Sequence, residues 1–137
     1  MLLIAVALFI IGSIGDNLLT YKYVVVEGVY GEANPFTASR IFSQPLWMWF
    51  VYDFAGLVAV VALALGYRVL MLWLSRRDPL WRRERIRRIA SKYWVIVMVV
   101  AGIRLLPVVH NLLILAFGVE SPLPVVNRFF WELLNNR

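Results

Sequence analysis

The chain of 137 residues has no cysteine and few charged side chains. Without cysteine, disulfide frameworks, thiolate metal sites and cysteine nucleophiles are excluded. Charged residues make up 16% of the chain and hydrophobic residues 62%, whereas about a quarter of a soluble domain is charged. So few charges do not cover a water-facing surface. The composition therefore predicts a single membrane domain, much of whose surface contacts lipid.

Three long apolar segments predict three membrane-spanning helices, at about residues 2–26, 46–74 and 93–117. Each has at least the roughly twenty residues that a bilayer core requires. The first segment lacks the basic start and the small-residue cleavage site of a signal peptide, so we expect a spanning helix there. Pro107 is expected to kink the third helix, because proline removes a backbone hydrogen bond.

Positive charge is concentrated between the second and third apolar segments. Residues 76–92 contain eight basic and two acidic residues, and the rest of the chain contains six of each. This asymmetry predicts a basic cytoplasmic loop that continues as helix into the third span, with the N-terminus on the same side and the C-terminus outside. Nucleic-acid binding is the alternative. No nucleic-acid motif or aromatic stacking platform accompanies the arginines, so we predict no nucleic-acid partner.

The C-terminal tail predicts one more, shorter helix. Over about residues 123–135, apolar residues recur at helical spacing from Val126 to Leu134, with polar residues on the other side. This pattern is typical of an amphipathic helix that lies in the membrane interface, and packing against the bundle is the alternative. The predicted fold class is therefore an all-α polytopic membrane protein with three transmembrane helices and a C-terminal interfacial amphipathic helix.

Four ionisable residues fall inside the apolar segments: Asp16, Asp53, Arg104 and His110. Such residues are costly in lipid and need a partner or a purpose. At about 1.5 Å per residue, the predicted topology places Asp16, Asp53 and Asn111 at a common level near the outer surface, with Arg104 about two turns deeper. The candidate polar cluster comprises Asp16, Thr20, Glu32, Asn34, Asp53, Arg104, His110 and Asn111.

Two interpretations of this cluster remain open. One is structural, with Asp16 or Asp53 paired to Arg104 to hold the bundle together. The other is a polar site open to the outer side, in which His110 serves as a base or a metal ligand. The chain has one histidine, which argues against a haem with two strong ligands. No metal site is predicted, and the sequence identifies no cofactor.

The second apolar segment also carries a stripe of small residues, which allow close approach of helices in lipid. Asp53 lies nearly opposite this stripe, so one face can close the bundle while the other meets a second subunit. The predicted partners are membrane lipids and other membrane subunits or copies of the chain. The predicted packing face consists of Ala55, Ala59, Ala62 and Gly66.

The sequence resembles a family of small prokaryotic integral membrane proteins of unknown function. The resemblance rests on Asp16 and Thr20 in the first span, the Glu32-Ala33-Asn34-Pro35 turn, and Arg104 and Asn111 in a late span. A single threonine, Thr20, stands where the family often has two. The family implies the topology and the choice of residues but no activity.

Three functions are compatible with these patterns. A non-catalytic accessory or structural subunit of a membrane complex or homo-oligomer fits the small size and the extra packing face. The alternative is an intramembrane hydrolase or metal-binding enzyme with a polar site near the outer leaflet. Transport would require oligomerisation, because three helices do not readily enclose a pathway, and the inverted repeats of transporters are absent.

Overall fold

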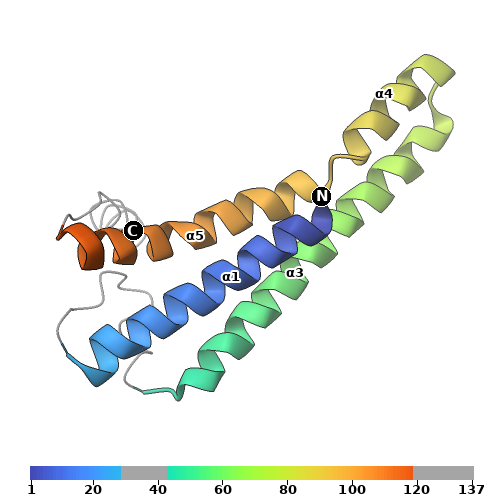
Figure 1. The fold of residues 1–137 in the computed structure, drawn as a ribbon. Helices are drawn as coiled ribbons and strands as arrows, with labels where there is room; N and C mark the ends of the chain where they lie inside the picture. The colour runs from blue at the N-terminus through green and yellow to red at the C-terminus, as the bar shows by residue number, and fades with distance from the viewer. Residues whose placement is uncertain (29–42, 119–137) are drawn as a thin grey trace, which may run out of the picture.

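The structure is a computed structural model that describes residues 1–28 and 43–118. Within these residues the chain is helical, without strands, and three helices are long and apolar enough to cross a membrane. This confirms the all-helical class and the three membrane-length helices. The elements, shown in Figure 1, are α1 (Leu2–Thr20), a π-helical turn η1 (Tyr21–Val26), α3 (Leu46–Leu74), a 3₁₀ turn η2 (Ser75–Arg77), α4 (Leu80–Ala90) and α5 (Trp94–Phe117).

Two expectations fall outside the described residues. The amphipathic helix predicted at about 123–135 belongs to the C-terminal tail, and Glu32 and Asn34 belong to the loop between the first two spans. Both therefore remain predictions.

Prolines and a glycine set several helix boundaries. α3 and α4 each begin directly after a proline with extended backbone, Pro45 and Pro79. α5 ends at Gly118, whose φ of 65° is the left-handed conformation that glycine adopts readily after a helix. The Gly118 N–H donates to the carbonyl of Ile114 and so satisfies one of the last free carbonyls. α5 is continuous through Pro107.

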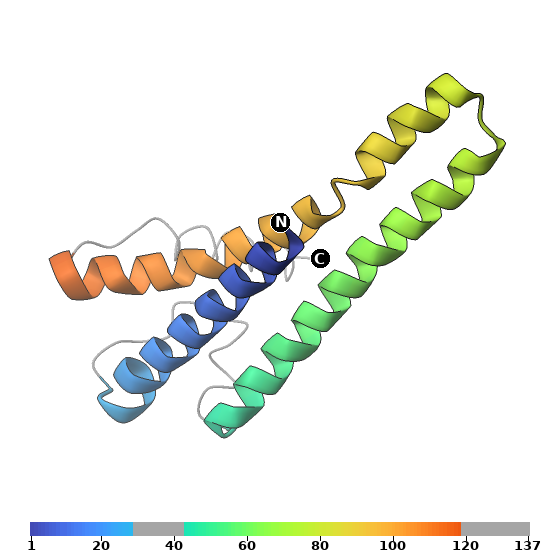
Figure 2. The ribbon, with the colours of Figure 1, turned by 45° about the vertical axis from the view of Figure 1, so that its right-hand side comes forward.

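α1 and α5 form the closest helix pair. The two helices lie side by side and run in the same direction from the end near Met1, whereas α3 runs in the opposite direction (Figures 1 and 2). Two glycines of α1 allow this approach. A Cβ atom on Gly12 would lie 3.1 Å from the carbonyl oxygen of Arg104, and one on Gly15 would lie 3.2 Å from the side chain of Val108. Small residues thus bring the backbones together, as is usual between helices in lipid.

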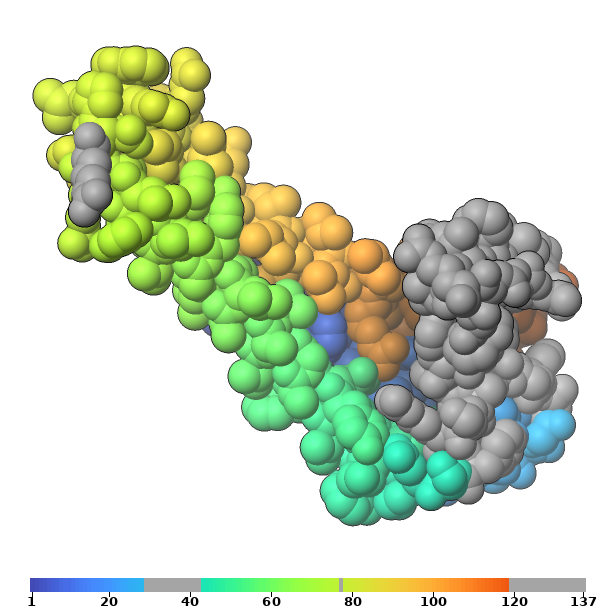
Figure 3. Space-filling model, turned by 180° about the vertical axis from the view of Figure 1, so that it is seen from behind, coloured from blue at the N-terminus to red at the C-terminus, as the bar shows by residue number. Residues whose placement is uncertain are grey.

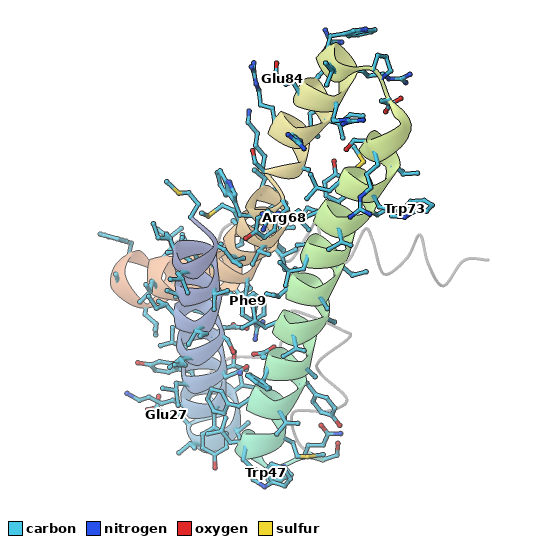
Figure 4. All side chains as sticks on the ribbon, turned by 90° about the vertical axis from the view of Figure 1, so that its right-hand side faces the viewer. Phe9, Glu27, Trp47, Arg68, Trp73 and Glu84 are labelled. Atoms are coloured by element: carbon cyan, nitrogen blue, oxygen red, sulfur yellow. The ribbon has the colours of Figure 1, made fainter. Side chains whose placement is uncertain are left out.

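The buried core is small and lies at the half of the bundle nearer Met1. Ala5, Val97 and Ala101 are fully buried between α1 and α5. Phe9 leaves α1 on the side of α3 and joins this core (Figure 4). α3 is attached less closely, because 11% of its most apolar stretch is buried, against 28% for α1. Most of the surface of α3 is therefore not covered by the other described helices.

The basic segment 76–92 is helical from Leu80 and leads into the third span, which runs from Leu80 to Phe117 with one break, a turn at residues 91–93. α4 is a separate helix that folds back along the end of α3 and is followed by a turn at residues 91–93 (Figures 1 and 3). Arg83 fixes the turn between α3 and α4, since its guanidinium donates to the backbone carbonyls of Ser75, Arg76 and Asp78. Ser91 ends α4 by donating its hydroxyl to the carbonyl of Arg88. We call residues 69–92 the basic hairpin.

Aromatic contacts mark both ends of the part of the bundle that has membrane dimensions. At one end Tyr21 packs edge-on against Trp49, with ring centroids 6.1 Å apart. At the other, the Arg68 guanidinium lies over the Tyr93 ring at 5.1 Å. From Trp49 to Arg68, α3 rises about 28 Å at ~1.5 Å per residue, close to the ~30 Å thickness of a bilayer core. The basic hairpin extends beyond this distance (Figure 4).

Candidate functional site

A network of hydrogen bonds joins all three long helices around Arg104 of α5. The Arg104 guanidinium donates from Nη1 to Oδ2 of Asp16 at 2.8 Å and from Nη2 to Oδ2 of Asp53 at 2.5 Å. A third, longer bond of 3.3 Å reaches Oδ1 of Asn17. We call Ser13, Asp16, Asn17, Asp53 and Arg104 the Arg104 network. A single planar guanidinium thus connects carboxylates from two different helices.

Asp53 is the acceptor on which most of these bonds converge. Its Oδ2 receives the Ser13 hydroxyl at 2.5 Å, the Asn17 amide at 2.8 Å and the Arg104 guanidinium. Three donors use the acceptor capacity of one carboxylate oxygen fully. Asp53 is the residue of α3 that joins the network, so these bonds hold α3 against the α1–α5 pair.

Helical spacing on α1 explains why one helix serves two neighbours. Ser13 and Asn17 lie one turn apart and both face Asp53 on α3. Gly12 and Asp16 are also one turn apart, and they face Arg104 on α5. Residues three or four apart share a helix face. Two adjacent polar rows on α1 therefore point to two different helices.

The network lies inside the membrane-length part of the bundle, toward the end opposite the basic hairpin. Asp53 is seven residues from the start of α3, about 10 Å along the helix. Arg104 begins deeper, ten residues from the start of α5 and thirteen from its end. Its backbone lies beside Gly12, one turn before Asp16, so the long side chain reaches outward to the two carboxylates.

The three charged side chains of the network are mostly shielded. The exposed fractions are 23% for Arg104, 16% for Asp16 and 22% for Asp53. The network contains two carboxyl groups and one guanidinium, so it holds one more acid than base. Charges this shielded require partners, and each has at least one here. The Arg104 Nε is buried and has no hydrogen-bond partner among the described residues.

The structure places the other predicted residues around the network or apart from it. Thr20 lies one turn after Asp16 and its hydroxyl is a hydrogen-bonding neighbour of that carboxylate. His110 is buried, but it lies six residues after Arg104, about 120° away around α5 at ~100° per residue. Asn111 is half-buried and further along α5. The described hydrogen bonds of the network thus bring Asp16, Asp53 and Arg104 together.

Sequence reasoning did not include Ser13 and Asn17 among the site residues. Both are buried, and both donate to Asp53. A usable signal was present, because Phe9, Ser13 and Asn17 recur every four residues and form a face next to Gly12 and Asp16. Serine and asparagine are weak signals singly, whereas their recurrence on one face of an apolar helix is informative.

The predicted packing face lies on the outside of α3. Ala55, Ala59, Ala62 and Gly66 are all exposed, whereas Leu57 and Ala64, on the side of Asp53, are buried. A Cβ atom on Gly66 would meet nothing within 4 Å. Within the described residues, therefore, no helix of this chain covers the face.

The described side chains of the network form a bridge of hydrogen bonds and ion pairs between the three helices. Among residues 1–28 and 43–118, no group of three or more histidine and acidic side chains is placed to hold a metal ion. The Asp53 oxygen that accepts the Ser13 hydroxyl is already occupied by the guanidinium and an amide. The Ser13 hydroxyl is thus one of three donors that a single carboxylate oxygen holds together, which is a bridging arrangement.

Comparisons with known proteins gave no match: no protein-family model, no curated protein and no solved structure resembles the chain significantly. The assignment below therefore rests on the geometry of this chain.

Proposed function

We propose that this chain is a non-catalytic accessory or structural subunit of a membrane complex or homo-oligomer. One observation carries the proposal: the small residues of α3 that allow close helix packing, Ala55, Ala59, Ala62 and Gly66, are exposed on the side opposite Asp53. Small exposed residues allow another helix to approach closely, whereas lipid needs no such groove. The Arg104 network supports the same proposal, because its ion pairs account for Asp16 and Asp53 without catalysis.

The proposed topology follows from the charge of the basic hairpin. The three membrane-length helices are compatible with a multi-pass protein of the cell membrane. The excess of arginine in the hairpin favours a cytoplasmic location for it and for the N-terminus, and an outside location for the C-terminus. The resemblance to the small prokaryotic membrane proteins, including the Glu32 and Asn34 turn, remains part of this proposal.

We expect the α3 face to bind a second copy of the chain. Ala59→Leu places a larger side chain in the middle of the face and should shift wild-type oligomers toward monomers in mild detergent. Ala7→Leu is the matched control, because Ala7 is exposed on α1, outside the α3 face. Native mass spectrometry measures the stoichiometry of all three proteins.

Each outcome of this comparison is decisive. Equal stoichiometry for Ala59→Leu and the wild type would exclude the α3 face as the contact. If the wild type contains one copy of the chain and co-purifies with a different membrane subunit, the complex is a hetero-complex and not a homo-oligomer. A monomer without any partner would contradict the proposal. Because the chain has no cysteine, Ala62→Cys adds an independent test: a disulfide between two copies would place their α3 faces in contact.

A second candidate function, intramembrane hydrolysis, is favoured by the 2.5 Å contact between the Ser13 hydroxyl and Asp53. In that function Ser13 would be the nucleophile and Asp53 its base. A fluorophosphonate probe would then label the wild type at Ser13 but leave Ser13→Ala unlabelled. We favour the structural function because Asp53 is already bound to Arg104 and Asn17. Labelling of Ser13 would reverse this preference.

A further inference from the structure

The basic hairpin has two faces with different chemistry. Arg83, Ile86 and Ala90 of α4 lie on the partly or fully buried side that packs on α3. Trp81 (68% exposed) lies on the opposite side, and Leu80 (79% exposed) is the first residue of α4. Trp73 and Leu74, at the end of α3, are exposed as well. Four large exposed apolar side chains at the tip of a highly basic element require an explanation.

The basic side chains of the hairpin that the structure describes fall into two groups. Arg83 is bound to backbone carbonyls and Arg82 lies 3.7 Å from Asp78. The others are exposed and form no ion pair with another described residue, so their charge is available to a ligand. This second group consists of Arg76, Arg85, Arg87, Arg88 and Lys92.

Two of these free arginines line an open hollow on the outer side of α4. The hollow has a volume of about 190 Å³ and is lined by Trp81, Glu84, Arg85 and Arg88. It therefore combines two guanidinium groups with an indole ring and one carboxylate. Arginine pairs bind phosphate oxygens through charge-assisted hydrogen bonds, and tryptophan favours the membrane interface.

The position of the hollow relative to the membrane-length part favours a lipid headgroup. Arg88 and Arg85 lie five and eight residues before Tyr93, which corresponds to about 7 and 12 Å along α4. The headgroup layer begins where the hydrocarbon core ends and is roughly 5–8 Å thick on each side. An upright hairpin would place Arg88 in this layer but Arg85, Trp81 and Leu80 beyond it, at about 12, 18 and 20 Å from Tyr93. The hairpin must therefore lean over toward the leaflet to bring both guanidiniums to the phosphates and Leu80 and Trp81 to the lipid surface.

We propose that the basic hairpin docks on the leaflet next to it and binds the headgroup of an anionic phospholipid between Arg85 and Arg88. This inference rests on the membrane-spanning topology proposed above, but not on the oligomer. A lipid occupant explains the arginines and the exposed apolar side chains together. An RNA occupant would explain the arginines alone.

The test is native mass spectrometry of the delipidated, full-length protein titrated with phosphatidylglycerol or phosphatidylcholine. Near an anionic surface each arginine contributes about a fivefold change in affinity. We therefore expect preferential phosphatidylglycerol binding that Arg85→Gln/Arg88→Gln weakens by about 25-fold. Lys22→Gln is the control, because it removes a positive charge at the other end of the bundle, where Lys22 pairs with Glu27. It should leave phosphatidylglycerol binding unchanged.

Three results would overturn the inference. The first is equal binding of the two lipids, and the second is wild-type affinity in the double variant with unchanged helical content. The third is displacement of phosphatidylglycerol by a single-stranded RNA oligonucleotide, which would assign the hairpin to nucleic acid. The same spectra report stoichiometry separately, so failure of the lipid site and failure of the proposed oligomer are distinguishable.

A second measurement locates the hairpin without altering any arginine. Leu80→Cys creates the chain's first cysteine, which carries an environment-sensitive fluorophore in nanodiscs. Phospholipids with brominated acyl chains should quench the fluorophore when the nanodisc contains phosphatidylglycerol, and less in phosphatidylcholine alone. A probe that only a water-soluble quencher reaches in both lipids would show that the hairpin stands in water.

Discussion

Replacing Arg104 is the most direct test of what the network does. Arg104→Gln removes the guanidinium that binds Asp16 at 2.8 Å and Asp53 at 2.5 Å, and it leaves both carboxylates shielded without a cation. Removal of one partner from a buried ion pair costs about 3–5 kcal/mol. Because Asp53 is the α3 residue of the network and 11% of the most apolar stretch of α3 is buried, we expect a loss of that size and separation of α3 from the α1–α5 pair.

Arg68→Gln is the matched control for this variant. It removes the same group from the same fold, but Arg68 is exposed and contacts the Tyr93 ring rather than a carboxylate. An exposed cation–π contact contributes about 0.5–1 kcal/mol. Unfolding in mixed detergent micelles of increasing dodecyl sulfate content, followed by circular dichroism, measures both variants on the same scale.

A triple variant tests whether the stability lost in Arg104→Gln comes from the two carboxylates left without a cation or simply from the removal of a polar side chain. Asp16→Asn/Asp53→Asn/Arg104→Met removes every charge of the network, and replacement of a complete ion set by uncharged residues is often nearly neutral. Its stability should therefore return to within about 1–2 kcal/mol of the wild type. Equal losses for Arg104→Gln and Arg68→Gln, or a triple variant as unstable as Arg104→Gln, would refute the bridging role.

Two further predictions concern α1 and α3. Gly12→Ala should destabilise the bundle by about 1–3 kcal/mol, because its Cβ would lie 3.1 Å from the Arg104 carbonyl oxygen. Gly66→Ala is the comparison, because a Cβ there has open space. It should raise the melting temperature or leave it unchanged. The reverse order would contradict the close α1–α5 contact. Ser13→Ala should cost about 1 kcal/mol, the net contribution of one hydrogen bond, since Asp53 keeps two other donors. A loss above 3 kcal/mol in the same unfolding assay would mean that Asp53 depends mainly on Ser13.

The sequence predicts the helices well because their physical cause is local. Runs of apolar residues bounded by Pro45 or Gly118 are visible without tertiary information, and the three helices occur there. The turn between α4 and α5 is not predictable in this way. Ser91 is compatible with a helix interior, so the residues of this turn do not mark it. The position of α4 on α3, where Arg83 donates to the Ser75 carbonyl and Ala90 is buried, is a tertiary contact. How α3 and α4 pack against each other cannot be predicted from the sequence.

The candidate site was also predictable only in part. Charged residues in apolar helices are conspicuous, so Asp16, Asp53 and Arg104 were predictable, and a pair of Arg104 with Asp16 or Asp53 was one of the two interpretations of the sequence. Their partners depend on the rotation of each helix and on the 3.1 Å approach at Gly12, which sets the height of Arg104 relative to α1. Ser13 and Asn17 became part of the site only because Asp53 faces them across that packing.

The two charged regions of the molecule act on α3 from opposite ends. Near its start, Asp53 ties α3 to the other helices through Arg104. Beyond Arg68, the basic hairpin continues α3 out of the membrane-length part of the bundle, and in the proposed arrangement lipid headgroups hold it there. Between these points α3 has few buried residues, Leu57 and Ala64 among them. Fixing both ends of a loosely packed helix holds its exposed small-residue face, centred on Ala59 and Ala62, in one orientation. A partner helix binds a face more tightly when the face is already held in the bound orientation.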